Sequence, residues 1–544
     1  MHVRLFGAAF LFVPLFVVIA TVSADPADVR QASRPNVIYI MADDLGIGDV
    51  KCYGASRCLV DTPHFDRLAR EGMRFTDVHT IASVCVPSRI AIMTGRYPWR
   101  FRTPSRRGRW GYLVPRFSTQ QFTLGVLLRA AGYRTGYVGK WHLGTRMQTT
   151  DGELQGSSNV DYGKPLLVGP PQFGFDESFI LPGSLDMYPY AFIRNNRWLG
   201  QVTAQKGWSA FNRVGPAAED FEDVDVLNTF SREAEQFIAK NAEAARSGVP
   251  FFLYLALTSP HTPVSPSKEF QGKSMIGPYG DFIMETDDCI GRVLKALEAH
   301  GIDDNTLVIA TSDHGPASYA GLQRKAVAGQ VRELEELGHH PSGPYRGYKF
   351  SAYEGGLRVP FVARWPRLIS PGKTCDALVG LNDLMATVAE IAGVGLDDNQ
   401  GPDSVSFLPL LKDAAVESPR SSLVLQSTRR FVVREGQWKL ILAVGCGCSG
   451  RHGNARPEKE AWNQTVKLFG RDPSDADLRR APFVQLYDLN SDSGEESNLA
   501  SQYPERVERL IALLEKSVAC GRSTPGESLK NDVDDVPIVF RPRA

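Results

Sequence analysis

A thiol lies at the start of a predicted helix in this 544-residue sequence. Pro87 suits a first helical turn, where its missing N–H is not needed, so Cys85 would lie at the helix N-terminus. Free N–H groups at that end favour an anion, and Arg89, one turn further on, adds a positive charge. The spacing predicts a reactive cysteine with a lowered pKa. A buried or disulfide-bonded cysteine is the alternative interpretation.

Three carboxylates could bind a metal ion. Asp43 and Asp44 are adjacent, and Asp313 precedes His314. Carboxylate oxygens are hard ligands that suit Ca²⁺ or Mg²⁺. Neighbouring carboxylates repel each other unless a cation lies between them. A turn or helix-cap pair is the ordinary interpretation of two aspartates, but the Asp313-His314 pair favours a metal. The nitrogen of His314 suits Ca²⁺ less well, which leaves the identity of the metal open.

Two lysines and two histidines complete the candidate chemistry. Lys140 and His142 lie within the box Gly-Lys-Trp-His-Leu-Gly, His261 follows a long apolar run, and Lys349 comes later in the chain. Lysines held in place stabilise a developing negative charge, and histidines transfer protons near neutral pH. A surface lysine or a structural histidine is the ordinary alternative for each of these residues taken alone.

Apolar runs alternate with amphipathic segments along the first 310 residues. This strand–helix alternation predicts an α/β fold with a large, mainly parallel sheet between layers of helices. Predicted strands cover residues 36–41, 73–78, 134–138, 251–257 and 306–310, and predicted helices cover 63–70, 122–131 and 281–300.

The candidate residues follow the predicted strands. Asp43 and Asp44 come after the first strand, Lys140 after the 134–138 strand, His261 after the 251–257 strand and Asp313 after the 306–310 strand. Ligands of open α/β sheets bind outside the carboxyl ends of the strands. These four runs are therefore expected to deliver their polar side chains to one site.

The composition changes near residue 420, after which short antiparallel strands are expected at 423–425, 431–433 and 439–442, with a helix at 503–518. We divide the chain into a catalytic domain at 34–420, a C-terminal subdomain at 421–520 and a tail at 521–544, expected to be loosely attached. Residues 316–344 are interpreted as an insertion that contains a helix near 331–337.

The N-terminus predicts export. A basic start, an apolar run and a small-residue cleavage pattern resemble a signal peptide over residues 1–24, and no other stretch is apolar enough to span a membrane. The compartment would be periplasmic, extracellular or lysosomal according to the host. The 61 basic and 61 acidic residues argue against a nucleic-acid binder. The eight cysteines are irregularly spaced; Cys52 and Cys58 could close a small loop.

These motifs, in this order, resemble the formylglycine-dependent sulfatases, an arylsulfatase-like family of the alkaline phosphatase superfamily. The resemblance covers about residues 35–499. It rests on Asp43-Asp44, Cys85-Val86-Pro87-Ser88-Arg89 with Thr94-Gly95-Arg96, the box Gly139 to Gly144, Ser312-Asp313-His314-Gly315, Lys349 with Glu354-Gly355-Gly356, and Leu486-Tyr487-Asp488-Leu489.

The resemblance implies that Cys85 is oxidised to formylglycine (3-oxoalanine) by a formylglycine-generating enzyme. The hydrated aldehyde would then attack the sulfur of a sulfate ester, Asp313 would help to take its proton, and Arg89 would hold the hydrate. His261 would protonate the departing alcohol, and His142 would accept the proton that lets sulfate leave.

The remaining roles are also implied by the resemblance. Lys140 and Lys349 would bind the sulfate group, and Ser184 matches a sulfate-contacting serine of some members. The implied metal is Ca²⁺, with Mg²⁺ as the alternative. Its ligands would be Asp43, Asp44, Cys85, Asp313 and His314.

Two other functions stay open from sequence. One is a formylglycine-type phosphoester or phosphonate hydrolase, and the other is an inactive protein that binds sulfated glycans. For the substrate, a carbohydrate sulfate is preferred to an aryl or steroid sulfate. This preference rests on the export signal and on a run of arginines that could bind a polyanionic glycan, although such a run is more often a solvated loop. The run comprises Arg100, Arg102, Arg106, Arg107 and Arg109.

Overall fold

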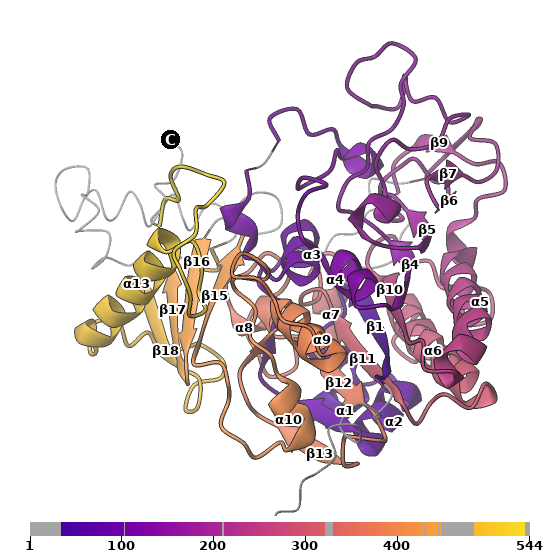
Figure 1. The fold of residues 1–544 in the computed structure, drawn as a ribbon. Helices are drawn as coiled ribbons and strands as arrows, with labels where there is room; N and C mark the ends of the chain where they lie inside the picture. The colour runs from indigo at the N-terminus through magenta and orange to yellow at the C-terminus, as the bar shows by residue number, and fades with distance from the viewer. Residues whose placement is uncertain are drawn as a thin grey trace, which may run out of the picture. The chain divides into compact units, whose positions relative to one another are not determined.

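A ten-stranded mixed sheet forms the centre of the protein, in the order β13-β2-β12-β11-β1-β10-β4-β5-β6-β7 (Figure 1). The computed structural model describes residues 34–102, 104–208, 212–320, 330–428, 430–443, 445–447 and 484–538. The strands of this sheet are β1 (Asn36–Asp43), β2 (Met73–Phe75), β4 (Arg134–Lys140), β5 (Glu177–Leu181), β6 (Ile193–Arg194), β7 (Arg197–Trp198), β10 (Phe251–Pro260), β11 (Thr306–Ser312), β12 (Phe361–Arg364) and β13 (Lys373–Cys375).

The five central strands, β11-β1-β10-β4-β5, run parallel, which confirms the predicted fold class. β1 is buried over its whole length, as expected for an apolar run that is covered on both faces. Antiparallel pairs lie further out, where β12 joins β11 and β6 joins β5. The sheet is therefore mixed at its sides and parallel where the polar residues follow the strands.

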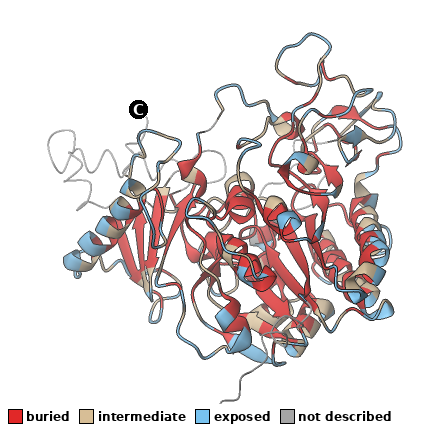
Figure 2. Cartoon of the chain, viewed as in Figure 1, coloured by how far each residue is buried: buried red, intermediate tan, exposed pale blue. Residues whose placement is uncertain are grey.

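Alternate residues of β1 enter two different cores, because successive strand side chains point to opposite faces. Val37 and Tyr39 pack with residues of α3, α4 and α9, whereas Ile38 and Ile40 pack with residues of α2, α5 and α6. The buried sheet lies between helices whose outer faces are exposed (Figure 2). These helices are α2 (Pro63–Glu71), α3 (Cys85–Thr94), α4 (Leu124–Ala130), α5 (Val226–Arg246), α6 (Pro278–Ala299) and α9 (Leu384–Ala392).

A second, antiparallel sheet follows, covered by one helix as predicted; it has four strands, of which three were expected (Figure 1). The helix buries Val507, Leu510, Ile511 and Leu514 in the core that it shares with this sheet. The domain boundaries at residues 420 and 520 stay a prediction. The elements are β15 (Ser422–Ser427), β16 (Arg430–Glu435), β17 (Trp438–Leu442), β18 (Val484–Asp488) and α13 (Pro504–Ala519).

The shorter elements connect these layers. The expected strand at 73–78 is divided, because β3 pairs in a separate two-stranded sheet with β14. The expected insertion helix is present as α7, whereas residues 321–329 lie outside the described part. The bounds are β3 (Val78–His79), β8 (Ala204–Lys206), β9 (Gly215–Ala217), β14 (Val379–Gly380), α1 (Lys51–Gly54), α7 (Gln330–Glu336), α8 (Glu354–Leu357) and α10 (Leu408–Lys412).

Two minor expectations are wrong. Cys52 and Cys58 are both free cysteines, so they do not close a loop. The described part of the tail, to residue 538, is packed rather than loose: Arg522 donates to Asp398 at 2.6 Å, and Asn531 accepts from Arg100 at 2.9 Å. The predicted signal peptide lies outside the described residues. Among those described, no helix combines the length and apolarity that a membrane span needs.

Three of the five arginines in the run pair with carboxylates, which leaves less unpaired positive charge for a polyanion. Arg100 is fully buried and makes a two-pronged contact with Asp403, at 2.8 and 2.9 Å. Arg102 pairs with Asp534 at 3.3 Å. Arg106 pairs with Glu153 at 3.0 Å.

Arg100→Ala should lower the free energy of unfolding by about 3–5 kcal/mol, because it leaves the buried Asp403 without its cation. Arg106→Ala is the matched control. Its pair is exposed at both ends, so the loss should stay below about 1 kcal/mol. Urea denaturation followed by tryptophan fluorescence measures both changes, and equal losses in the two variants would contradict the assigned difference.

Candidate active site

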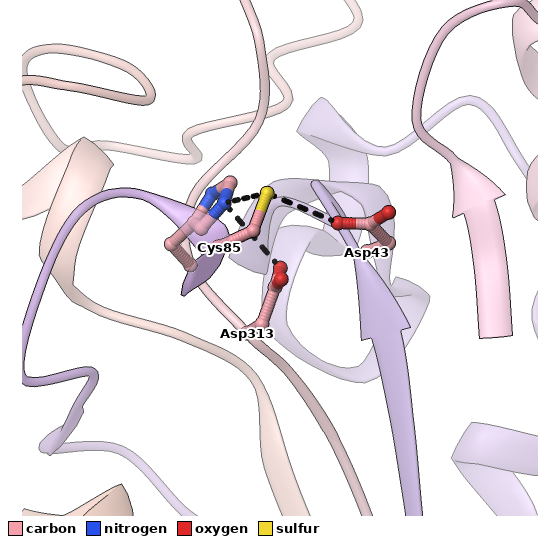
Figure 3. A group of neighbouring side chains, drawn as sticks. Asp43, Cys85 and Asp313 are labelled. Carbon is pink, nitrogen blue, oxygen red and sulfur yellow. Dashed lines mark hydrogen bonds and ion pairs between the residues drawn. The ribbon is translucent and has the colours of Figure 1, made fainter. Parts of the chain in front are cut away.

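Aspartates from two neighbouring parallel strands meet at one edge of the sheet (Figure 3). β1 ends at Asp43 and pairs with β11, which places Ala42 opposite Ser312 and brings Asp313 beside the end of β1. Asp44 has a φ of 67°, a left-handed conformation that non-glycine residues seldom adopt. Such backbone strain often marks functional sites, and here it follows directly after the central strand.

Cys85 lies at the N-terminus of α3, as predicted, and its side chain points at this aspartate edge (Figure 3). Its Sγ donates to Asp43 Oδ1 at 3.5 Å and lies 3.2 Å from His314 Nε2. Cys85 is only 3% exposed. The expected lowering of its pKa is wrong: burial raises the pKa of the thiol, and although Lys140 and Lys349 oppose this, Asp43 and Asp313 add to it.

Arg89 holds Asp313 in place from the next turn of α3. Its Nε and Nη2 both donate to Asp313 Oδ2, at 3.2 and 3.0 Å, and its Nη1 donates to the carbonyl of Lys140 at 3.1 Å. The guanidinium is 1% exposed. The two N–H groups converge on one carboxylate oxygen, and charge-assisted hydrogen bonds of this kind are stronger than neutral ones. Arg89 therefore links α3, β4 and the end of β11.

The ammonium groups of both candidate lysines contact the aspartates at the end of β1. Lys140 Nζ donates to Asp43 Oδ2, and Lys349 Nζ donates to the two oxygens of Asp44 at 2.7 and 2.9 Å. Burial works to raise the pKa of Asp43, but the buried cations Lys140 and Arg89 hold it well below its usual value. Burial raises the pKa of Asp44 to about 7 against the opposing charge of Lys349. The site thus combines anionic and cationic groups in a closed space.

The two candidate histidines reach the same space. His142 follows β4 with a φ of 53°, and its Nδ1 is buried without a hydrogen-bond partner among the described residues. His261 Nδ1 donates to the carbonyl of Thr262 at 2.6 Å, and its Nε2 lies 3.8 Å from Asp44 Oδ2. Burial, followed by Lys140 at His142 and by Lys349 at His261, lowers both pKa values well below the ordinary one. Both rings are therefore neutral at neutral pH.

The donor set fits a divalent cation. His314 Nδ1 donates to the carbonyl of Gly315 at 2.9 Å, and burial lowers its pKa to about 4, so Nε2 carries a lone pair. This lone pair faces Asp44 Oδ1 at 3.4 Å and Asp313 Oδ1 at 3.5 Å, an arrangement that repels unless a cation lies between. Ligand atoms of Asp43, Cys85, Asp313 and His314 all lie within 4.8 Å of one another.

The turn that follows β5 adds two more polar groups. Only one of them was a candidate from the sequence. Ser184 is fully buried, and its Oγ has no partner in the part of the chain that the structure describes. Asp186 from the same turn places Oδ1 4.0 Å from His261 Nδ1. Burial raises the pKa of Asp186, against the charges of Arg213, Lys140 and Lys349. Sequence reasoning missed Asp186 and Arg213, because neither follows a recognisable strand or motif.

The edge of the α/β sheet thus gathers buried carboxylates, lysines and histidines into a site suited to an anionic ester. Residues 35–394 match the sulfatase family, to which the chain belongs, and it is therefore a sulfuric ester hydrolase. It is 33% identical to an N-acetylgalactosamine-6-O-sulfatase of Bacteroides thetaiotaomicron over 525 residues, covering 89% of this chain and 93% of the relative. It is 34% identical to a steryl-sulfatase of Rattus norvegicus over 433 residues, covering 70% and 71%.

The solved structures agree with this assignment. A Bacteroides thetaiotaomicron sulfatase, solved in work on the metabolism of multiple glycosaminoglycans, superposes with a TM-score of 0.72 at 31% identity, covering 89% of this chain and 99% of the other. A Pseudoalteromonas sulfatase superposes with a TM-score of 0.67 at 22% identity, covering 91% of each chain, which shows the shared fold.

Proposed function

We propose that the chain hydrolyses a sulfate ester on a carbohydrate and releases inorganic sulfate, with Cys85 converted to formylglycine. The position of Cys85 carries this proposal: its Sγ lies between Asp43 and His314, in a space that also holds two buried lysines. The likeness to an N-acetylgalactosamine-6-O-sulfatase over most of both chains supports a sugar as the alcohol. A formylglycine at this position supplies, as its hydrate, an oxygen nucleophile in place of the thiol.

The lysines and Ser184 would bind the sulfate group. Lys140 and Lys349 are buried, and their ammonium groups sit in the cluster around Cys85. Preorganised cations in a dry site stabilise transition-state charge more strongly than water does. Ser184 adds a buried hydroxyl that has no other partner among the described residues. Arg89 would hold residue 85 and Asp313 in their relative orientation.

The histidines would move protons. A lowered pKa suits His142 to accept a proton, because its ring is neutral at neutral pH. His261 would instead protonate the departing sugar oxygen. An anionic ester bound beside Lys349 would offset the charge that lowers the pKa of His261, and would so favour its protonated form. The two rings would therefore act at different stages of turnover.

A divalent cation would be held by Asp43, Asp44, Asp313, His314 and residue 85. We propose Ca²⁺, with Mg²⁺ as the alternative, because oxygen donors predominate in the set. The bound cation would neutralise the carboxylates and polarise an oxygen ligand. Elemental analysis of the dialysed protein should find about one calcium per chain, and zinc at that stoichiometry would contradict the proposal.

Export and maturation follow from the same proposal. Residues 1–24 would direct the chain out of the cytosol to a periplasmic, extracellular or lysosomal compartment. A formylglycine-generating enzyme would be its partner during maturation. N-terminal sequencing of the protein secreted by its host should begin near residue 25, whereas a chain that keeps Met1 would contradict cleavage.

Mass spectrometry of the proteolytic peptide that contains Cys85 tests the nucleophile. Protein from its own host should show an aldehyde in place of the thiol, and an intact thiol would favour the glycan-binding alternative. Sulfate release from a sulfated sugar tests the reaction itself. Matched sugar sulfate and sugar phosphate esters should be cleaved with a preference for sulfate, and the opposite preference would favour the phosphoester alternative.

A further inference from the structure

A carboxylate and a guanidinium lie beside the candidate proton donor without a role in the chemistry described above. Asp186 accepts from Arg213 Nη1 at 3.0 Å through Oδ2, and its main-chain carbonyl accepts from the same nitrogen at 2.6 Å. The other carboxylate oxygen, Oδ1, is buried and accepts no hydrogen bond from the residues that the structure describes. A buried acceptor left unpaired costs stability, so this oxygen calls for a ligand.

The pair is held in position by a closed turn and by a stacked aromatic ring. Met187 N–H donates to the carbonyl of Ser184 at 2.9 Å, which closes the turn that carries Asp186. The Arg213 guanidinium stacks on the ring of Trp110, 3.8 Å from its centroid. Trp110 itself has a left-handed φ of 56°. The strained backbone of Trp110 and the stacking of Arg213 on its ring indicate that the guanidinium is held in place before a ligand binds.

The location of the pair indicates what the ligand is. Asp186 Oδ1 lies 4.0 Å from His261 Nδ1, on the ring that would protonate the departing alcohol. Because His261 Nδ1 donates to the Thr262 carbonyl, Nε2 would carry the proton to the leaving oxygen, and Asp186 on the other side of the ring would contact a part of the alcohol beyond that oxygen. The side chain of Arg213 stays 30% exposed, and among the described residues its hydrogen bonds run through Nη1 alone. Further guanidinium N–H groups can therefore reach a bound molecule.

We propose that Asp186 and Arg213 bind two neighbouring hydroxyl groups of the sulfated sugar ring and determine specificity for a carbohydrate alcohol. One hydroxyl donates to Asp186 Oδ1, and the oxygen of the other accepts from the Arg213 guanidinium. A buried site built to bind hydroxyl groups strongly disfavours an alcohol that lacks them, because its own polar groups then stay unpaired. Aryl and steroid sulfates lack such a pair. This inference rests on the proposed function and identifies the part of the substrate that the site recognises.

The test compares Asp186→Asn with wild type on N-acetylgalactosamine 6-sulfate and on 4-nitrophenyl sulfate. The kcat/KM ratio of sugar over aryl substrate should fall by about 30–100-fold, the scale of one lost charge-assisted hydrogen bond. Asp304→Asn is the matched control, because Asp304 pairs with Arg367 at an exposed surface, where the ratio should stay within about 2-fold. Arg213→Gln should lower the ratio in the same direction.

Deoxy sugars separate binding from an indirect effect. Removing the sugar hydroxyl that donates to Asp186 should lower the kcat/KM of the wild type about as much as Asp186→Asn does. The same deoxy sugar should lower the kcat/KM of the Asp186→Asn variant little further, because the variant has already lost that contact. An equal loss on both substrates, with a shifted pH profile, would overturn the proposal and make Asp186 a positioning residue for His261. A wild-type protein that releases sulfate from neither substrate would instead contradict the proposed function.

Discussion

Cys85→Ala should lower sulfate release by at least about 10⁴-fold, the scale at which hydrolases lose activity when the nucleophile is removed. Alanine lacks the thiol that is oxidised to the aldehyde, and its methyl group cannot attack sulfur. The cations that would bind the ester remain, so the affinity for a sulfated sugar should change by less than about 10-fold. Steady-state sulfate release and calorimetric titration of the sugar sulfate measure the two effects separately.

Cys289→Ala controls for the loss of a buried thiol. Cys289 lies in α6 and is 2% exposed, but it belongs to the core on the side of the sheet opposite α3. This variant should keep sulfate release within about 3-fold of wild type, because surface and core changes remote from a site act through stability. Substantial activity in Cys85→Ala would refute the nucleophile assignment, whatever the control shows.

Lys140→Met should lower kcat/KM by about 10²–10³-fold, the cost of removing one preorganised charge-stabilising donor. Lys140 stays charged in the folded protein, because Asp43 outweighs the effect of burial and raises its pKa above the ordinary value. Methionine keeps most of the volume and removes the charge. The loss should appear mainly in kcat, because negative charge on the leaving oxygen grows in the transition state.

Lys240→Met is the matched control for this substitution. Lys240 is 63% exposed and pairs with Glu177 at the surface, so its removal should leave kcat/KM within about 2-fold. Thermal unfolding of Lys140→Met must be measured as well, since the ion pair that Asp43 would keep, with Arg89 Nη2 at 3.6 Å, is longer than a hydrogen bond. A folded variant with wild-type kcat/KM would exclude Lys140 from binding the sulfate.

The centre of the fold could be read from the sequence because its signals are local. The runs that became β1, β10 and β11 are continuously apolar, as strands covered on both faces must be. Parallel strands share a carboxyl edge, so the residues after them were expected to meet, and Asp43, Asp313 and Lys140 do meet. Their catalytic roles remain predictions, since proximity alone assigns no step of a reaction.

Long-range partners could not be read in the same way. Arg100 belongs to a run that reads as solvated, yet its carboxylate partner Asp403 is 303 positions further along the chain. The thiol of Cys85 was expected to ionise easily, because its helix end was visible but its burial between two aspartates was not. Asp186 and Arg213 lie in irregular segments, where no periodicity marks the side that faces the site.

The burial of Cys85 limits when another enzyme can modify it. A side chain that is 3% exposed is closed to a second enzyme once the sheet has formed, so an enzymatic modification there must be complete by then. His314, which covers the thiol, follows it by 229 positions. At about 5–20 residues per second, synthesis of that stretch takes roughly 10–50 s. On the proposed function, a chain that folds before Cys85 is modified would keep its buried thiol and would lack the nucleophile.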